Sequence, residues 1–449
     1  MKSGKCFVFF GVVLVAARIA VSTGMADSTT DAVTAQDTKK ILQNNFVETA
    51  EKELVLSGYM DTGYSYNFNS AGQAQVWPRF AEDSAQYGDF NLYAVKLALE
   101  KPLTDENRAQ AGFRTDIMVG EDARYLANRS LDGDGAFENN EQDSNGLFIE
   151  QAYAQFRIPV GNGWDWKVGK FVAILGFEAN ERPSNMNTTF GLLWQQIPVY
   201  YIGVLSTYAF DEYLTGQLGV VNGANSDNNL NTSGTGDGYA LVADLSLTNP
   251  GGNAQWMSNF QYSTSPESDS AYSPTATSFY VEGNSGVNGG GAYTLIYESW
   301  GTWAPKFASD KLLLAFDALL GTSNAGEYAG TSTTWYGAAT YAKYQFNDWF
   351  HLASRGEYLG GNNLGKVGAL TDTNGDYMTA DQSLNHPLSW WEYTITAGFQ
   401  ITDEALLRGE FRMDWGNYTS GPTLGTGDTG SIMGSGPSYY AGAEIIYSF

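Results

Sequence analysis

Few residues of this chain could carry covalent chemistry. His351 and His386 are its only histidines, and a hydrolase needs such a base beside an activated nucleophile. The chain contains no G-x-S-x-G, H-E-x-x-H or phosphate-loop motif. His351 has the polar parity of an alternating segment, which favours a structural histidine facing a wet interior. We therefore predict that the protein is not an enzyme and that it has no cofactor.

Two acidic stretches have the spacing with which a calcium loop begins. Residues 132–135 (DGDG) and 372–376 (DTNGD) alternate oxygen ligands along the chain. Neither completes the pattern, because Ala136 stands where a ligand belongs and Tyr377 where a glycine belongs. Ordinary turns have the same composition. We predict no dedicated metal site; weak recruitment of divalent cations by these loops stays an open alternative.

Charged residues of both signs recur at every second position of otherwise apolar segments. The clearest example is Arg408-x-Glu410-x-Arg412-x-Asp414. Such a ladder suits a water-filled interior, where opposing walls of charge orient polar solutes and select ions. The alternative is that these residues pair across strands and stiffen the wall. The residues with this parity, which we predict to line a pore, are Lys96, Arg114, Asp116, Arg157, Lys167, Lys343, Arg355, Glu357, Glu392, Arg408, Glu410, Arg412, Asp414 and Glu444.

One long connection carries further charges. Residues 172–196 lie between two predicted strands and include Glu178, Glu181 and Arg182. We predict that this segment folds inward and narrows the interior, with these three side chains at the constriction.

The elements that must position these residues are β-strands, because apolar and polar residues alternate in stretch after stretch. In 93–100, for example, Tyr93 and Val95 share an apolar face opposite Lys96. The predicted strands are 54–68, 93–100, 113–119, 147–158, 164–171, 197–210, 213–222, 239–248, 254–263, 291–304, 311–321, 335–346, 349–359, 391–401, 405–415 and 439–449. Polar connections at 121–146, 223–238, 263–290 and 360–388 are predicted to be exposed loops.

A soluble β-sandwich has the same alternation, so other features must decide between the two folds. Apolar faces repeatedly begin or end in Tyr, Trp or Phe, as in the aromatic girdles of a membrane barrel. The last strand ends in Tyr447-Ser448-Phe449, which resembles the C-terminal strand of bacterial outer-membrane proteins. We predict an all-β fold, an antiparallel up-and-down transmembrane barrel of about 16 strands, within a range of about 14–18.

The N-terminus resembles an export signal. Lys2 and Lys5 precede an apolar stretch over 7–17, and Gly24-Met25-Ala26 has the small-x-small pattern of a cleavage site. We predict a signal peptide over 1–26, an N-terminal periplasmic segment over 27–50 with a short helical pattern, and the barrel over 51–449. Cleavage near Ala26 would also remove the single cysteine, Cys6.

Charge excludes one class of partner. The net charge is −25, so the clustered Lys and Arg that phosphate contacts need are lacking, and nucleic acid is not expected as a partner. The acidic total instead suggests a mild preference for cations.

Several short segments resemble a known family. Residues 168–171 (VGKF), 175–178 (LGFE), 197–204 (IPVYYIGV) and 221–225 (VNGAN) are similar to those of the OmpL-like β-barrel porin family of Gram-negative bacteria. The resemblance covers 54–449, and its motifs are short ones that recur in many porins. It implies a barrel in the outer membrane with a channel role, and it supplies no catalytic residue.

Together these observations predict a porin that passes small hydrophilic solutes or ions by passive diffusion. Its expected surroundings are outer-membrane lipid and lipopolysaccharide, and a homo-oligomer is an open alternative. Another function to be weighed is a surface adhesin or receptor that works through its long acidic loops.

Overall fold

The computed structural model describes residues 49–51, 54–68, 88–127, 147–222, 239–264, 293–309, 311–323, 333–361, 378–379, 388–417, 419–420 and 437–449. Its strands are β1 (Thr49–Glu51), β2 (Leu54–Asn67), β3 (Asp89–Lys101), β4 (Gln110–Val119), β5 (Leu147–Ile158), β6 (Trp164–Val172), β7 (Tyr200–Ala209), β8 (Leu214–Val221), β9 (Tyr239–Thr248), β10 (Ala254–Thr264), β11 (Tyr293–Trp303), β12 (Leu312–Ser323), β13 (Thr333–Asn347), β14 (Phe350–Gly361), β15 (Met378–Thr379), β16 (Leu388–Gln400), β17 (Ala405–Asn417), β18 (Thr419–Ser420) and β19 (Ser438–Ser448). Its helices are α2 (Glu121–Ala127) and the short 3-10 turns η2 (Arg182–Ser184), η3 (Trp194–Gln196) and η4 (Lys306–Ala308).

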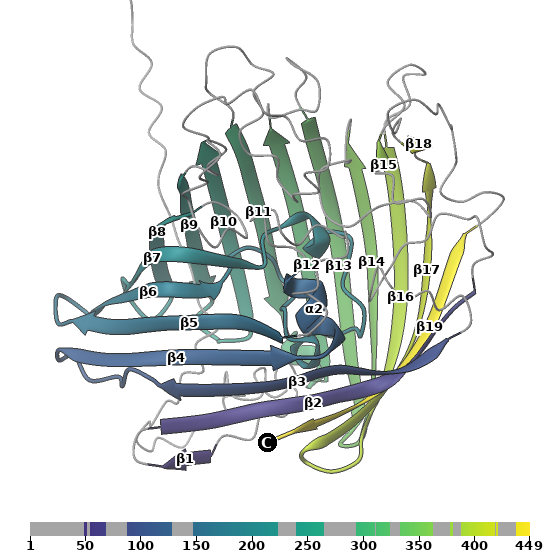
Figure 1. The fold of residues 1–449 in the computed structure, drawn as a ribbon, viewed down its shortest axis with the longest axis horizontal. Helices are drawn as coiled ribbons and strands as arrows, with labels where there is room; N and C mark the ends of the chain where they lie inside the picture. The colour runs from purple at the N-terminus through teal and green to yellow at the C-terminus, as the bar shows by residue number, and fades with distance from the viewer. Residues whose placement is uncertain are drawn as a thin grey trace, which may run out of the picture.

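Sixteen of these strands close into an antiparallel barrel (Figure 1). Each pairs with its neighbours in chain order, and β19 returns to pair with β2, so no long edge is left open. The prediction of a closed barrel of about sixteen strands is confirmed. The short β1 pairs with the first residues of β2, and β15 pairs with β18 in a separate two-stranded sheet.

Short connections gather at one end of the barrel. They are 102–109, 159–163, 210–213, 249–253, 304–311, 348–349 and 401–404. The strand number is even, so β2 begins and β19 ends at this same end, as Figure 1 shows. Most of the predicted loops at the other end lie outside the described residues. An exception is 121–127, which was expected to be loop and forms α2.

The two faces of the wall differ as the alternation predicts. On β17, Leu407 and Phe411 are about two-fifths exposed (38% and 43%), whereas Arg408 and Arg412 are fully buried at 0%. Outward aromatic side chains gather near both rims. Trp349 stacks on Phe399 at 6.1 Å near the short turns, and Tyr358 contacts Trp391 at 4.6 Å near the other end. Because lipid cannot hydrogen-bond the backbone, a closed ladder with this exterior suits a membrane.

The predicted faces are wrong where a β-bulge changes the parity. The register of β2 and β3 shifts between Asp61 and Thr62, and the extra residue on β3 is Tyr93. Tyr93 was expected on the outer face with Val95, but it points inward and is 1% exposed. A bulge inserts one residue into one strand, so the alternation restarts with the opposite sense.

The segments before the barrel are mostly outside the described residues. The predicted signal peptide and the helical pattern within 27–50 therefore stay predictions. Thr49 and Ala50, the end of that predicted segment, lie in β1 beside the barrel. No helix among the described residues has the length and apolar character needed to cross a membrane.

Candidate functional site

The connection between β6 and β7, residues 173–199, is the main occupant of the barrel interior; we call it the inner segment. Its two ends lie side by side, because the Ala173 N–H donates to the Val199 carbonyl at 3.1 Å. Its side chains are buried almost throughout. The inner segment therefore leaves the wall through a narrow neck and folds up inside the barrel, close to the predicted 172–196.

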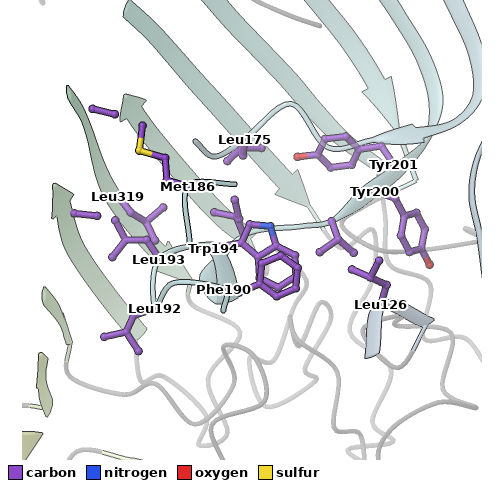
Figure 2. Close-up of a cluster of buried hydrophobic side chains, with 14 of the residues drawn as sticks. Leu126, Leu175, Met186, Phe190, Leu192, Leu193, Trp194, Tyr200, Tyr201 and Leu319 are labelled. Atoms are coloured by element: carbon purple, nitrogen blue, oxygen red, sulfur yellow. The ribbon is translucent and has the colours of Figure 1, made fainter. Parts of the chain in front are cut away.

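An apolar cluster forms the body of the inner segment (Figure 2). Phe190 and Trp194 stack with their ring centroids 3.5 Å apart and their planes 9° apart. Phe177 reaches the wall, where its ring lies 4.6 Å from Tyr341 on β13. The alternation predicts a wet interior and not this cluster, since periodicity cannot show which inward positions a folded loop will cover.

Arg355 on β14 is the central contact between the inner segment and the wall. Its guanidinium donates to Glu178 at 2.6 Å and to the Thr189 carbonyl at 2.7 Å, both on the inner segment. It also pairs with Glu392 on β16 at 3.0 Å. All three charged side chains are at most 3% exposed. A buried charge needs such partners, because leaving it unpaired is costly.

Two carboxylates on the same wall accept backbone N–H groups of the inner segment. Glu410 on β17 accepts from Thr188 at 2.5 Å and from Thr189 at 3.0 Å. Glu357 on β14 accepts from Leu192 at 2.6 Å. These are charge-assisted hydrogen bonds, which are stronger than neutral ones. They fix the backbone of the inner segment rather than one side chain.

Two further arginines bind carbonyl groups of the inner segment. Arg408 donates to Asn185 at 2.8 Å and pairs with Glu444 at 2.5 Å. Arg412 donates to the Phe190 carbonyl at 2.6 Å and pairs with Asp414 at 2.8 Å. We call the set formed by Arg355, Glu357, Glu392, Arg408, Glu410, Arg412, Asp414 and Glu444 the arginine wall. Alternation on β14, β16, β17 and β19 points all of its members inward, because each strand repeats its faces every second residue.

A second anchor lies on β3, β4 and β5, which β2 separates from the arginine wall. The Lys96 ammonium lies 3.0 Å from Asp116 and 2.6 Å from Glu181 of the inner segment, and it also contacts Glu150. We call these four residues the lysine cluster. The three carboxylates lie within 4.8 Å of one another, a spacing that could hold a metal ion. Here the ammonium takes the central position.

Glu150 belongs to the lysine cluster because of another β-bulge. The register of β4 and β5 shifts between Asp116 and Ile117, which leaves Glu150 as the extra residue of β5. Glu150 and its neighbour Gln151 therefore both point inward. Glu150 was not among the predicted pore residues, although two adjacent polar residues in an alternating strand are a signal of a bulge.

Helix α2 supports the inner segment beside the lysine cluster. Asp122 of α2 accepts two hydrogen bonds from Arg182 Nε, at 2.7 and 2.8 Å, and Asp122 and Arg182 are at most 1% exposed. The Arg182 guanidinium also lies 3.9 Å from the Phe190 ring centroid. Arg182 therefore joins the apolar cluster to α2, and Asp122 is a partner that no strand pattern could have revealed.

The remaining predicted pore residues differ in their access to solvent. Arg114 pairs with Glu100 at 2.9 Å, and the side chains of both are 23% exposed. Arg157 pairs with Asp165 at 2.6 Å, with side chains 15% and 22% exposed. Lys167 lies 4.7 Å from the Tyr153 ring centroid. These residues form a polar surface on β3–β6 that is more open than the arginine wall.

Lys343 and His351 are predicted interior residues that lie on neighbouring strands. Lys343 on β13 and His351 on β14 point inward and are each 4% exposed. His351 lies over Gly398, where a side chain would collide with its ring. His386 and the two calcium-like stretches, 132–135 and 372–376, lie outside the described residues.

The hydrogen bonds from the inner segment to Glu410 give a first prediction. Glu410→Gln keeps the shape but removes the charge, so we expect the free energy of unfolding to fall by about 1.5–3 kcal/mol, the range for hydrogen bonds to charged groups. Urea unfolding of the protein in lipid vesicles measures it. Glu212→Gln, at an exposed turn residue, is the control. Equal losses in both variants would contradict the role of Glu410.

The chain is similar to known barrels along most of its length. A family model described as "Putative beta-barrel porin-2, OmpL-like" matches residues 53–449. No curated protein matches the chain.

Solved structures resemble the chain in fold. The anion-selective porin from Comamonas acidovorans is 8% identical, with a TM-score of 0.56 over 88% of this chain and 99% of that chain. The outer membrane channel DcaP of Acinetobacter baumannii is 11% identical, with a TM-score of 0.53 over 89% and 99%. Salmonella typhi OmpF, in complex with daunomycin, is 10% identical, with a TM-score of 0.52 over 90% and 100%. At these identities the likeness concerns the fold alone.

Proposed function

Since this chain belongs to the putative beta-barrel porin-2, OmpL-like family, we propose that it forms a water-filled channel through which small hydrophilic solutes and ions diffuse passively. The observation that carries the proposal is the distribution of side chains on the closed barrel. Apolar and aromatic groups face outward, toward outer-membrane lipid and lipopolysaccharide, and ionisable groups face inward. A barrel of this width has room for water beside the inner segment.

The permeation path follows the open polar surface of β3–β6. Arg114 and Arg157 lie there with partly exposed partners, whereas the arginine wall is buried under the inner segment. The path therefore passes between this surface and the inner segment. Glu178, Glu181 and Arg182 set its width indirectly, because they hold the inner segment to Arg355, to Lys96 and to Asp122 of α2. No step of this transport needs a catalytic group.

Reconstitution of the purified full chain in a planar bilayer tests the channel. Discrete conductance steps that scale with salt concentration are the expected result. Their absence, from protein whose heat-dependent gel migration shows a folded barrel, would reject the channel and favour a surface adhesin or receptor acting through the long loops. Those loops are outside the described residues.

The overall charge of the chain predicts which ions the channel prefers. Acidic residues outnumber basic ones in the chain, 49 to 24, so we expect a reversal potential that indicates mild cation selectivity. Arg114→Gln leaves Glu100 and Asp116 less compensated and should increase this selectivity. Arg108→Gln makes the same charge change at an exposed short connection and should leave it unchanged. Identical reversal potentials in both variants would place Arg114 outside the path.

A further inference from the structure

A row of polar residues crosses four strands on a part of the inner wall that belongs to neither anchor. Gln217 on β8 pairs with Asp244 on β9, Asp244 with Asn259 on β10, and Asn259 with Glu298 on β11. Asp317 on β12 lies two residues from Leu319, the partner of Glu298. We call these five residues the acidic row. Directly paired side chains on one face lie about 4.5–5.5 Å apart at Cβ, so the row is unbroken from Gln217 to Glu298, and the diagonal step to Asp317 spans about 7–8 Å.

The acidic row is sealed from solvent. Gln217 is 1% exposed, Asp244, Asn259 and Glu298 are 0%, and Asp317 is 3%. Neither Glu298 nor Asp317 has a Lys, Arg or His within ion-pair distance in the part of the chain that the structure describes. The row therefore concentrates three carboxyl groups away from water without a basic side chain on Glu298 or Asp317.

Several oxygens of the row accept no hydrogen bond of good geometry within the described ranges. They include both carboxylate oxygens of Glu298, one of Asp317, and the side-chain oxygens of Asn259 and Gln217. The orientation of Asn259 is determined, because its Nδ2 donates to the Ile174 carbonyl at 2.7 Å. Its oxygen is left for another partner. The amide nitrogen of Gln217 has no partner there either, so nothing else in the described chain explains that side chain.

The Glu298 and Asp317 carboxyl groups lie within hydrogen-bonding reach of each other. Two ionised carboxylates have no proton to share, and they repel one another in a medium of low dielectric constant. Something positive must therefore lie between them, either a proton or a cation. The neighbouring amide oxygens favour a cation, because carboxylate and amide oxygens together are the ligands of Ca²⁺. A proton needs no such surroundings.

We propose that the acidic row binds one hard divalent cation, Ca²⁺ or Mg²⁺, through Glu298, Asp317 and the side-chain oxygen of Asn259. Asp244 adds negative charge one strand away, and Gln217 extends the oxygen row. The inner segment covers the site, since Asn259 holds the Ile174 carbonyl and Gly176 lies next to Glu298. The site therefore lies where the inner segment meets a third part of the wall, β8–β12.

Calcium binding to the full chain in detergent tests the proposal. Protein stripped of metal with a chelator is titrated with CaCl₂ or MgCl₂ in a calorimeter. The double variant Glu298→Gln/Asp317→Asn is expected to bind one ion fewer per chain than the wild type. Asp348→Asn/Asp403→Asn removes the same charge at exposed turn residues and should bind as the wild type does. Ions bound by every variant belong elsewhere on the chain.

Gln217 gives a second comparison that does not disturb the carboxyl groups. Gln217→Glu adds a carboxylate and should tighten Ca²⁺ binding by on the order of tenfold, because affinity follows the charge of the ligand set. Gln217→Met removes the oxygen without breaking any hydrogen bond within the described residues, and should not tighten it. Unchanged heat-dependent gel migration verifies that both variants fold.

Tb³⁺ offers an optical readout. Trp300 is the cross-strand partner of Asp317, so Tb³⁺ in the site should luminesce when tryptophan is excited. Trp300→Phe should keep the calorimetric binding and lower this luminescence.

Equal ion binding by wild type and Glu298→Gln/Asp317→Asn would overturn the proposal, and the carboxyl pair would then be held by a shared proton. This test measures ion binding and not conductance. A negative binding result would therefore leave the proposed channel intact, and a negative conductance result would leave the cation site intact.

Discussion

Excising residues 174–198 and joining Ala173 to Val199 through an Asn-Gly turn is expected to raise the single-channel conductance several-fold. The neck makes the closure feasible, because the two flanking residues already share a backbone hydrogen bond of 3.1 Å. The excised residues include Phe190, Leu193 and Trp194, which fill the interior of the barrel, and their removal widens the water-filled cross-section. Recording in planar bilayers at fixed salt measures the change.

The excised variant also changes the charge of the path. Arg355, Arg408 and Arg412 lose their contacts with the inner segment, and their guanidinium groups become accessible to ions. The carboxylates of Glu357 and Glu410 are uncovered with them, and the arginine wall holds more carboxylates than guanidinium groups, so we expect the mild cation preference to persist together with the rise in conductance. Heat-dependent gel migration verifies that the barrel still closes. Asp348→Asn, at an exposed turn residue, is prepared in the same way and should have the conductance of the wild type. A conductance equal to that of the wild type would reject the inner segment as the constriction.

Arg355→Met is expected to lower the free energy of unfolding by about 3–5 kcal/mol, the usual loss when one partner of a buried ion pair is removed. The loss is large because Glu178, Glu392 and the Thr189 carbonyl each lose a charged donor in a site with almost no solvent. Urea unfolding in lipid vesicles measures it. We also expect noisier single-channel currents, because the inner segment is released from β14.

Arg157→Met is the matched control, since it breaks an ion pair on the same barrel whose side chains reach solvent. Its expected loss is about 1 kcal/mol, as screened pairs contribute little. Arg355→Lys should fall between wild type and Arg355→Met, because an ammonium keeps the charge but not the two-pronged geometry. Losses of similar size at positions 157 and 355 would mean that Arg355 does not anchor the inner segment.

The inward and outward faces of the barrel wall could largely be predicted from strand periodicity. Alternation requires only that one face meet lipid and the other the interior, so Leu407 and Arg408 could be assigned to opposite faces from their order alone. Each member of the arginine wall was predicted to point inward for the same reason. The number of strands and the antiparallel order followed, because each strand ends in a recognisable turn or polar loop.

The contents of the barrel could be predicted only in part. The inward path of 172–196 was inferred from its length and charge, but its partners lie far along the chain on β14 and β17, and periodicity carries no information about such pairs. Tyr93 and Glu150 change faces at bulges, which one inserted residue causes and the alternation cannot locate with certainty. Asp122 lies in a helix within a segment expected to be loop.

Pairing of β2 with β19 has a consequence for biogenesis. Strands β2 and β19 pair with each other, so a copy can close only after β19 has been synthesised and exported. Until then the sheet has two unpaired edge strands. They make the immature chain prone to aggregation and dependent on chaperones. A truncation that removes the final strand should therefore eliminate the whole protein from the membrane, rather than leave a smaller version of it.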